Sequence, residues 1–466
     1  MAEMKRALGL FDVINLVIGT IVGADIYIAA AFGAGLLGPA SLLAWVLAGV
    51  MALVIALCFA ECSSLTPRVG GPYAYAREAF GDFAGFMVGW SLIIASWAAI
   101  AVFPLAFVAY LTYFFPHIVP WQQDLIKIAF VFFLTFINYR GVKEAGKIND
   151  ALTFLKIFPL IILTLLGLVF FILKPSHLIS NLTPFAPQGW DGMGGALVLI
   201  FWAYVGFELV TVPSDEILDA KRTIPRALVL GMVLIIVFYF LTNFVIVGSV
   251  SWQELSTSSA PLALAGKTII GGLGAIILAI GALFSISGSD EAGILSSARI
   301  PYAMAGDGLF PHFFARVHPV YGTPYLSLLV QGVVTTIATL LGTISELIIL
   351  SVFTLLLCYL VTCLSVFPLR KNYEGGINLP RVVPILGVII SVYLMTQCSP
   401  IQIVTGVLLM LLGIPVYIKY SPGDEIKSVK REIKERRGLF DRELRWRERF
   451  LSHTLGHLAS LMRRIR

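Results

Sequence analysis

Apolar runs of about 20 residues recur along the whole chain, and their length constrains the fold more than any other feature. A helix of about 20 residues crosses the roughly 30 Å hydrocarbon core of a bilayer. Of the 466 residues, 58% are hydrophobic and 13% are charged, and the mean hydropathy is +0.90. A soluble protein of this length would have too little polar surface to cover itself. We therefore predict an all-α polytopic membrane protein with about twelve transmembrane helices, at residues 9–36, 41–65, 83–114, 124–139, 144–173, 192–218, 226–250, 268–300, 324–342, 345–369, 381–398 and 400–420.

The basic residues of the loops indicate how the chain is oriented in the cell membrane. With the N-terminus inside, thirteen of the lysines and arginines between the helices fall on the inner side. Three fall on the outer side, namely Lys127, Lys174 and Lys267. Because positively charged loops stay in the cytoplasm, the bias predicts a multi-pass protein with both termini cytoplasmic. An even number of helices agrees with this orientation.

The composition changes at residue 421, where a charged tail begins. Residues 421–466 hold 13 Lys and Arg against 7 Asp and Glu, and this excess accounts for the whole net charge of +6. A charge confined to one tail argues against a nucleic-acid partner. The tail ends in a basic helical pattern with one apolar stripe, which predicts binding to anionic inner-leaflet lipid. A solvated helix without a special partner remains the alternative. We divide the chain into a transmembrane domain, 1–420, and this cytoplasmic tail.

Glycines interrupt two of the apolar runs at corresponding places. The first run carries "IGTIVGAD", and the sixth, five helices later, carries "AYVGFE". Interrupted membrane helices at matching positions in two halves are typical of the binding site of an inverted-repeat protein. Irregular backbone at membrane depth is tolerated only where it is buried or lines a cavity. The alternative is that these glycines only allow close helix packing.

Five motifs together resemble the amino acid, polyamine and organocation transporter family. They are "GTIVGADIY", "FAECSSLTPRVGGPYAYAREAFG", "WAYVGFE", "DAKRTIPRAL" and "ARIPYAMAGDGLFP", and the resemblance covers nearly all of residues 5–420. It implies a five-plus-five inverted repeat with broken helices 1 and 6 and two added helices. It also implies a secondary active transporter that moves an amino acid or amine by alternating access around a midplane site.

The resemblance also implies which residues touch the substrate. In the family, N–H groups freed at the helix 1 break bind the substrate carboxylate, and carbonyls of helices 1 and 6 bind its amino group. A helix 6 tryptophan stacks on the substrate in related arginine exchangers, and Trp202 matches its position, although an ordinary packing role stays open. Carried onto this chain, the substrate contacts are Ile21, Gly23, Ala24, Trp202 and Tyr204.

Lys156 lies about twelve residues into the fifth predicted helix, at membrane depth. Insertion of an ionisable side chain at this depth costs roughly 2.5–3.5 kcal/mol of free energy, so a lysine here is expected to have a structural or functional role. In some family members a lysine here takes the place of sodium, which implies contacts with helix 1 carbonyls and with Ser287. Because burial disfavours the charged ammonium, such a lysine can lose and regain a proton. We predict proton coupling, with a structural ion pair as the alternative.

Three acidic residues in later helices also need a role. Glu208 matches a common family acid just after the helix 6 break, where it braces helices 6 and 1 or relays a proton. Asp290 and Glu291 are less expected from the family pattern. Consecutive helical residues differ in direction by about 100°. We therefore expect one of the two to point toward Lys156 or the substrate and the other toward a neighbouring helix, and we include both in the proton-coupling group.

Asp25 departs most clearly from the family pattern, which has a glycine at this position to leave room for the substrate carboxylate. A carboxylate side chain there repels a second carboxylate and attracts an ammonium. One hypothesis is a positively charged substrate, either an amine such as a polyamine or a cationic amino acid. The alternative pairs Asp25 with Lys156 and leaves an ordinary neutral amino acid as substrate, by uptake or by exchange.

Other functional classes find no support in the sequence. The chain has no HExxH, G-x-S-x-G, P-loop or Cys/His zinc pattern, so we expect neither an enzyme nor a metal or other cofactor. No segment resembles the selectivity filter of a channel. A transporter-like sensor remains an alternative, and the oligomeric state is not predicted.

Overall fold

The computed structural model describes residues 8–68, 70–140, 142–212, 214 and 217–420, and for 142–154 the backbone alone. The tail predicted for residues 421–466 lies outside the described residues. In the described part the only ladder contact is one parallel bridge between Leu8 and Ile217, and the rest of the regular structure is helical.

The helices follow the predicted apolar runs. In the first half they are α1 (Leu10–Ile21), α2 (Ala24–Leu37), η1 (Gly38–Ala40), α3 (Ser41–Leu65), α4 (Pro72–Phe80), α5 (Asp82–Phe114), α6 (Pro120–Arg140), α7 (Val142–Leu173) and α8 (Pro175–Leu182). In the second half they are α9 (Met193–Phe201), η2 (Trp202–Tyr204), η3 (Phe207–Thr211), α10 (Ala220–Ser249), α11 (Trp252–Thr257), α12 (Pro261–Ile270), α13 (Gly272–Ser297), α14 (Arg299–Gly306), η4 (His312–Ala315), α15 (Tyr325–Leu341), α16 (Ile344–Asn372), α17 (Val382–Thr396) and α18 (Pro400–Tyr420).

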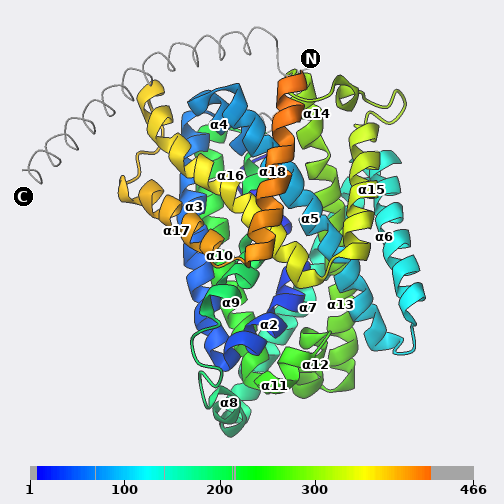
Figure 1. Cartoon of the computed structure of the whole chain (residues 1–466). Helices are drawn as coiled ribbons and strands as arrows, with labels where there is room; N and C mark the ends of the chain where they lie inside the picture. The colour runs from blue at the N-terminus through cyan, green and yellow to red at the C-terminus, as the bar shows by residue number, and fades with distance from the viewer. Residues whose placement is uncertain (1–7, 69, 141, 213, 215–216, 421–466) are drawn as a thin grey trace, which may run out of the picture.

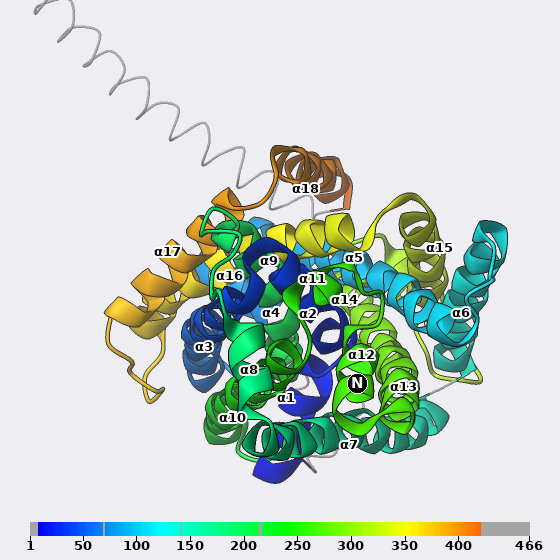
Figure 2. The same cartoon turned by 90° about the horizontal axis from the view of Figure 1, so that it is seen from below.

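Eight helical runs in the described chain are long and apolar enough to cross a membrane, which confirms a polytopic all-α membrane protein. Four predicted spans are completed by other helices: α1 completes the first, and α6, α15 and α17, with 21, 17 and 15 residues, correspond to the fourth, ninth and eleventh. The helices form one bundle (Figures 1 and 2). The start of α1 and the end of α18 lie at the same end of it, near α4 and α14, and α8, α11 and α12 lie at the opposite end (Figure 1). We call the first of these the terminal end.

The eighth predicted span, 268–300, starts before the helix that it describes. Its first turn belongs to α12, and α13 begins only at Gly272. Gly271 between them has φ +90°, a left-handed conformation that glycine adopts most readily and that ends α12. A Cβ on Gly266 would lie 2.8 Å from the Gly274 carbonyl oxygen, so α12 packs closely back on α13.

Both predicted breaks are present. The first helical run stops at Ile21 and restarts at Ala24. The sixth passes from α9 through two short 3₁₀ segments, η2 and η3, on either side of Gly206. A Cβ on Gly206 would lie 2.7 Å from the Thr20 carbonyl oxygen, so the two breaks are in contact. The inverted relation of the two halves stays a prediction.

Candidate functional site

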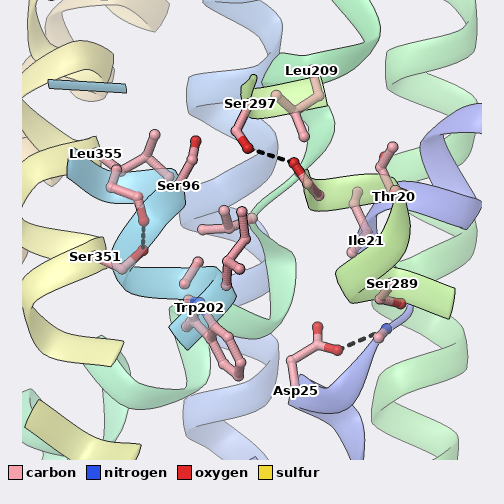
Figure 3. Close-up of a pocket in the computed structure, with 18 of the residues that line it drawn as sticks. Thr20, Ile21, Asp25, Ser96, Trp202, Leu209, Ser289, Ser297, Ser351 and Leu355 are labelled. Carbon is pink, nitrogen blue, oxygen red and sulfur yellow. Dashed lines mark hydrogen bonds between the residues drawn. The ribbon is translucent and has the colours of Figure 1, made fainter. Parts of the chain in front are cut away.

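A cavity of about 100 Å³ lies at the two breaks, between them and α5, α13 and α16; we call it the central cavity. Apolar and small side chains form most of its wall, with a few polar groups among them. In Figure 3, Asp25 and Trp202 lie at one end of it, and Leu209 and Ser297 lie at the other. The polar residues that line it are Thr20, Asp25, Ser96, Glu208, Ser289, Ser297 and Ser351. Among the described residues no Lys, Arg or His lines it.

Asp25 is held by its own break. It is 5% exposed, and its Oδ1 accepts a hydrogen bond from the Gly23 N–H, with N and Oδ1 2.7 Å apart (Figure 3). The Tyr239 hydroxyl of α10 lies 3.2 Å from Asp25 Oδ2 and 3.1 Å from the Ile21 carbonyl, and donates to one of them at a time. No ion pair joins Asp25 to Lys156 in the described chain, because the carboxylate is engaged by backbone and by tyrosine.

The other predicted substrate contacts divide into two groups. Ile21, Gly23 and Trp202 line the central cavity as expected, and Trp202 is buried against Phe103, with the ring centroids 6.1 Å apart. Tyr204 is not among the lining residues. Its hydroxyl donates instead to the Trp45 carbonyl at 2.9 Å. Ala24 is buried in the first turn of α2 and does not line the cavity either.

Glu208 sits between two cavities. Its Oε2 accepts the Gly206 N–H at 3.0 Å and the Tyr359 hydroxyl of α16 at 2.7 Å. It lines the central cavity and also a larger one of about 1260 Å³. The larger cavity, which we call the vestibule, is lined from α1, α4, α7, α10, α13 and α14 and lies toward the terminal end. Glu208 is therefore at the junction of the central cavity and the vestibule.

Lys156 lies behind the first break. It is 1% exposed, and its Nζ donates to the Gly19 carbonyl of α1 with 2.6 Å between N and O, which confirms the predicted contact with helix 1. The Tyr27 hydroxyl donates to the Lys156 carbonyl at 3.1 Å. No hydrogen bond joins Lys156 to Ser287 among the described residues, and the Ser287 hydroxyl donates to the Leu283 carbonyl of its own helix at 2.8 Å.

Asp290 and Glu291 are buried in α13, 0% and 1% exposed. Neither lines the central cavity or the vestibule, and neither forms an ion pair with Lys156 in the described chain. Among the described residues, both oxygens of Asp290 and one of Glu291 lack a hydrogen-bond partner. Neither side chain lines the central cavity, and the expectation that one of the two points toward Lys156 or the substrate stays a prediction.

The chain matches the family model described as amino acid permease over residues 8–419, nearly its whole length. It belongs to the amino acid permease family. The permease is therefore a membrane transporter of small molecules and not an enzyme, in agreement with the broken helices around a buried cavity.

Characterised relatives cover the same span. The permease is 26% identical to the branched-chain amino acid permease BcaP of Bacillus subtilis, over 90% of this chain and 94% of that one. It is 28% identical to the methylthioribose transporter of the same organism, with the same shares covered. It is also 28% identical to the human Asc-type amino acid transporter 1, over 89% of this chain and 82% of that one.

Three residues of the permease site were not singled out from the sequence. The Ser289 hydroxyl donates to the Val22 carbonyl at 3.2 Å. The Tyr239 hydroxyl reaches the Asp25 carboxylate, and the Tyr359 hydroxyl reaches the Glu208 carboxylate. The serine predicted to act on α13 was Ser287, two positions before Ser289. The two tyrosines stand in apolar runs of α10 and α16 with no local signal that sets them apart.

Proposed function

We propose that this permease is a secondary active transporter of a positively charged substrate and that it works by alternating access. The class we favour is a polyamine or another amine without an α-carboxylate, followed by a cationic amino acid. One observation carries the proposal: the Asp25 carboxylate accepts the Gly23 N–H at 2.7 Å, within the central cavity.

The Gly23 N–H is one of the helix 1 N–H groups that the family resemblance assigns to the substrate carboxylate. Here the protein supplies that carboxylate itself, through Asp25. Two like charges 4 Å apart repel by about 4 kcal/mol at an effective dielectric constant near 20, and an ammonium is attracted by as much. Since no basic side chain lines the cavity in the described chain, a cation fits it better than an α-amino acid with a free carboxylate.

A binding screen on the full-length permease tests the substrate class. We expect putrescine, spermidine, agmatine or arginine to raise the Tm of the purified protein, because a ligand that binds only the folded state stabilises it. Leucine and serine serve as neutral amino acids of comparable size. Stabilisation by the neutral amino acids with no response to any cation would reject the proposal.

A second candidate is transport of a neutral amino acid, by uptake or by exchange. The names of the relatives favour it, since two of the three above are named for amino acids. The same screen separates the two candidates. A sensor that binds without transporting would show stabilisation by ligand but no uptake into proteoliposomes.

We further propose that transport is coupled to protons through Lys156. Its ammonium, on a side chain that is 1% exposed, donates to the Gly19 carbonyl, where a positive charge holds α1 against α7, and a lysine ammonium can lose and regain a proton. Loss of that proton would remove the charge–carbonyl contact and loosen α1.

Imposed gradients test the coupling. In proteoliposomes, uptake should follow a pH gradient, and Lys156→Gln should abolish that dependence, whereas Lys267→Gln, at an exposed lysine of α12, should keep it. Uptake that follows a sodium gradient and ignores pH would contradict the proposal. Asp290 and Glu291 stay second candidates as proton carriers, because both are buried in α13 and three of their oxygens have no hydrogen-bond partner among the described residues. Ser287, bonded within its own helix, would then serve only to shape α13.

We also propose that both termini are cytoplasmic in the cell membrane and that the tail, 421–466, binds anionic lipid. The loop charges support the orientation, and the described ends of α1 and α18 share one end of the bundle. Deleting 421–466 should spare transport and weaken binding to vesicles with anionic lipid. Loss of transport on deletion would contradict an anchoring role.

A further inference from the structure

The two breaks carry the same short pattern, a glycine followed two residues later by an acid. At the first break it is Gly23 with Asp25, and at the second it is Gly206 with Glu208. In each, the carboxylate accepts the N–H of its own glycine, at 2.7 and 3.0 Å. In each, a tyrosine hydroxyl from a distant helix also reaches the carboxylate, at 3.2 and 2.7 Å. The chain therefore fixes two carboxylates at one cavity by the same means.

These two carboxylates are not neutralised by the cavity wall. Asp25 and Glu208 are 5% and 4% exposed, and in the described chain no basic side chain lines the cavity. A buried charge is stable only when it is paired. Each carboxylate has about four acceptor positions, and the N–H and hydroxyl contacts leave some of them for a ligand. When both carboxylates are ionised, Lys156 adds at most one positive charge from behind α1, which leaves one negative charge for a ligand.

The two carboxylates differ in their relation to the vestibule. Asp25 lines the central cavity but not the vestibule, and it lies at the end of the cavity opposite Leu209 (Figure 3). Glu208 lines the vestibule as well, and its chain neighbour Leu209 lies at the end of the cavity opposite Asp25 (Figure 3). The wall also holds apolar side chains, among them Ile21 and Val205. An elongated apolar chain with a charge at each end matches this arrangement.

We propose that the substrate is a short dication, an α,ω-diamine that places one ammonium at Asp25 and the other at Glu208. This inference rests on the proposed function and goes further, because it assigns the second charge of the substrate to a second residue. Glu208 is then a specificity-determining residue that separates diamines from monoamines. The acid at the second break is the last group that the substrate leaves on its way to the vestibule.

Equilibrium binding to the full-length permease in proteoliposomes tests the inference. The probes are 1,4-diaminobutane and n-butylamine, which have the same carbon chain and differ in the second ammonium. A charge-assisted hydrogen bond corresponds to roughly a tenfold or larger change in Kd, so the diamine should bind at least about tenfold more tightly. Glu208→Gln should bring the ratio of the two Kd values close to one. Glu254→Gln removes an exposed carboxylate of α11 and should keep the wild-type ratio.

The outcomes separate the two proposals. Equal affinity for the diamine and the monoamine in the wild type would overturn the dication and leave an amine transporter standing. Binding of neither amine, with binding of a neutral amino acid, would overturn the proposed function itself. A wild-type preference for the diamine that Glu208→Gln leaves intact would also overturn the role of Glu208. If Glu208→Gln does not fold, Glu208→Asp should move the best diamine to a longer chain, and an unchanged length optimum would count against the inference.

Discussion

The two helix breaks face one cavity and hold their carboxylates alike, but their backbones differ. At the first, Gly23 has φ −141°, which is not the left-handed region, and regular helices lie on both sides. At the second, Gly206 has φ +121°, and 3₁₀ segments replace the α-helix on both sides. The first break packs on Ser289 and borders the vestibule through Gly19, Thr20 and Val22, and the second borders both cavities at Glu208. The two breaks therefore differ in backbone conformation and local packing rather than in contact with the vestibule.

The largest difference between the breaks should appear when each glycine becomes alanine. Gly206→Ala forces a left-handed φ and places a Cβ 2.7 Å from the Thr20 carbonyl, which is backbone and cannot turn aside. Strain of this kind costs about 1–3 kcal/mol, so transport should be lost and Tm lowered. Gly23→Ala keeps an allowed φ and meets the Ser289 hydroxyl at 2.9 Å, so its Tm should fall less. Equal losses would show that the breaks are equivalent.

Removing the charge of Asp25 at the first break should weaken the binding of every amine. Asp25→Asn keeps an oxygen for the Gly23 N–H but leaves no negative charge for the first ammonium. We expect the Kd values of n-butylamine and 1,4-diaminobutane each to rise about tenfold or more. Isothermal titration checks this result. An Asp25→Asn protein that binds amines as tightly as the wild type would place the first ammonium elsewhere.

The two tyrosines should contribute less to diamine affinity than the carboxylates to which they are hydrogen-bonded. Tyr239→Phe removes the hydroxyl at Asp25, and Tyr359→Phe removes the one at Glu208. One hydrogen bond is worth about 0.5–1.5 kcal/mol net, so each change should weaken diamine binding about two- to tenfold. Only Tyr359→Phe should alter the ratio between diamine and monoamine. A change of that ratio in Tyr239→Phe would contradict the division between the two ends.

The smallest effect is expected at Ser289. Ser289→Ala removes one hydrogen bond to the Val22 carbonyl, at 3.2 Å, and should lower stability by about 1 kcal/mol or less. It also removes the hydroxyl that a Cβ on Gly23 would meet, so Gly23→Ala should be partly rescued in the double variant. Thermal unfolding of the two single variants and the double variant measures this coupling. Strictly additive losses would show that Ser289 does not limit the space at the break.

The sequence could predict where the backbone breaks but not what closes each break. The glycines of "IVGAD" and "YVGFE" interrupt apolar runs, and the structure has both interruptions. Asp25 was recognised as unusual, but its hydrogen bonds to the Gly23 N–H and the Tyr239 hydroxyl were not predicted. Its contact with the Gly23 N–H depends on the local geometry of two residues outside regular helix, which apolar periodicity does not encode.

Contacts between distant helices limited the prediction in the same way. Ser287 was chosen on α13, whereas Ser289 is the serine that reaches the first break. A shift of two residues turns a helix by about 200°, so it moves the side chain to the opposite face. Tyr239 and Tyr359 follow Asp25 and Glu208 by 214 and 151 positions, and no local pattern marks tyrosines at such a separation.

The most direct test of the account compares two ligands that differ only in the α-carboxylate. Arginine and its decarboxylated form, agmatine, share the guanidinium and the chain. Because Asp25 already supplies a carboxylate to the Gly23 N–H, the wild-type permease should bind agmatine at least about tenfold more tightly than arginine. Asp25→Gly frees that N–H and should shift the preference toward arginine. Wild-type binding of arginine as tight as that of agmatine, or tighter, would contradict the account.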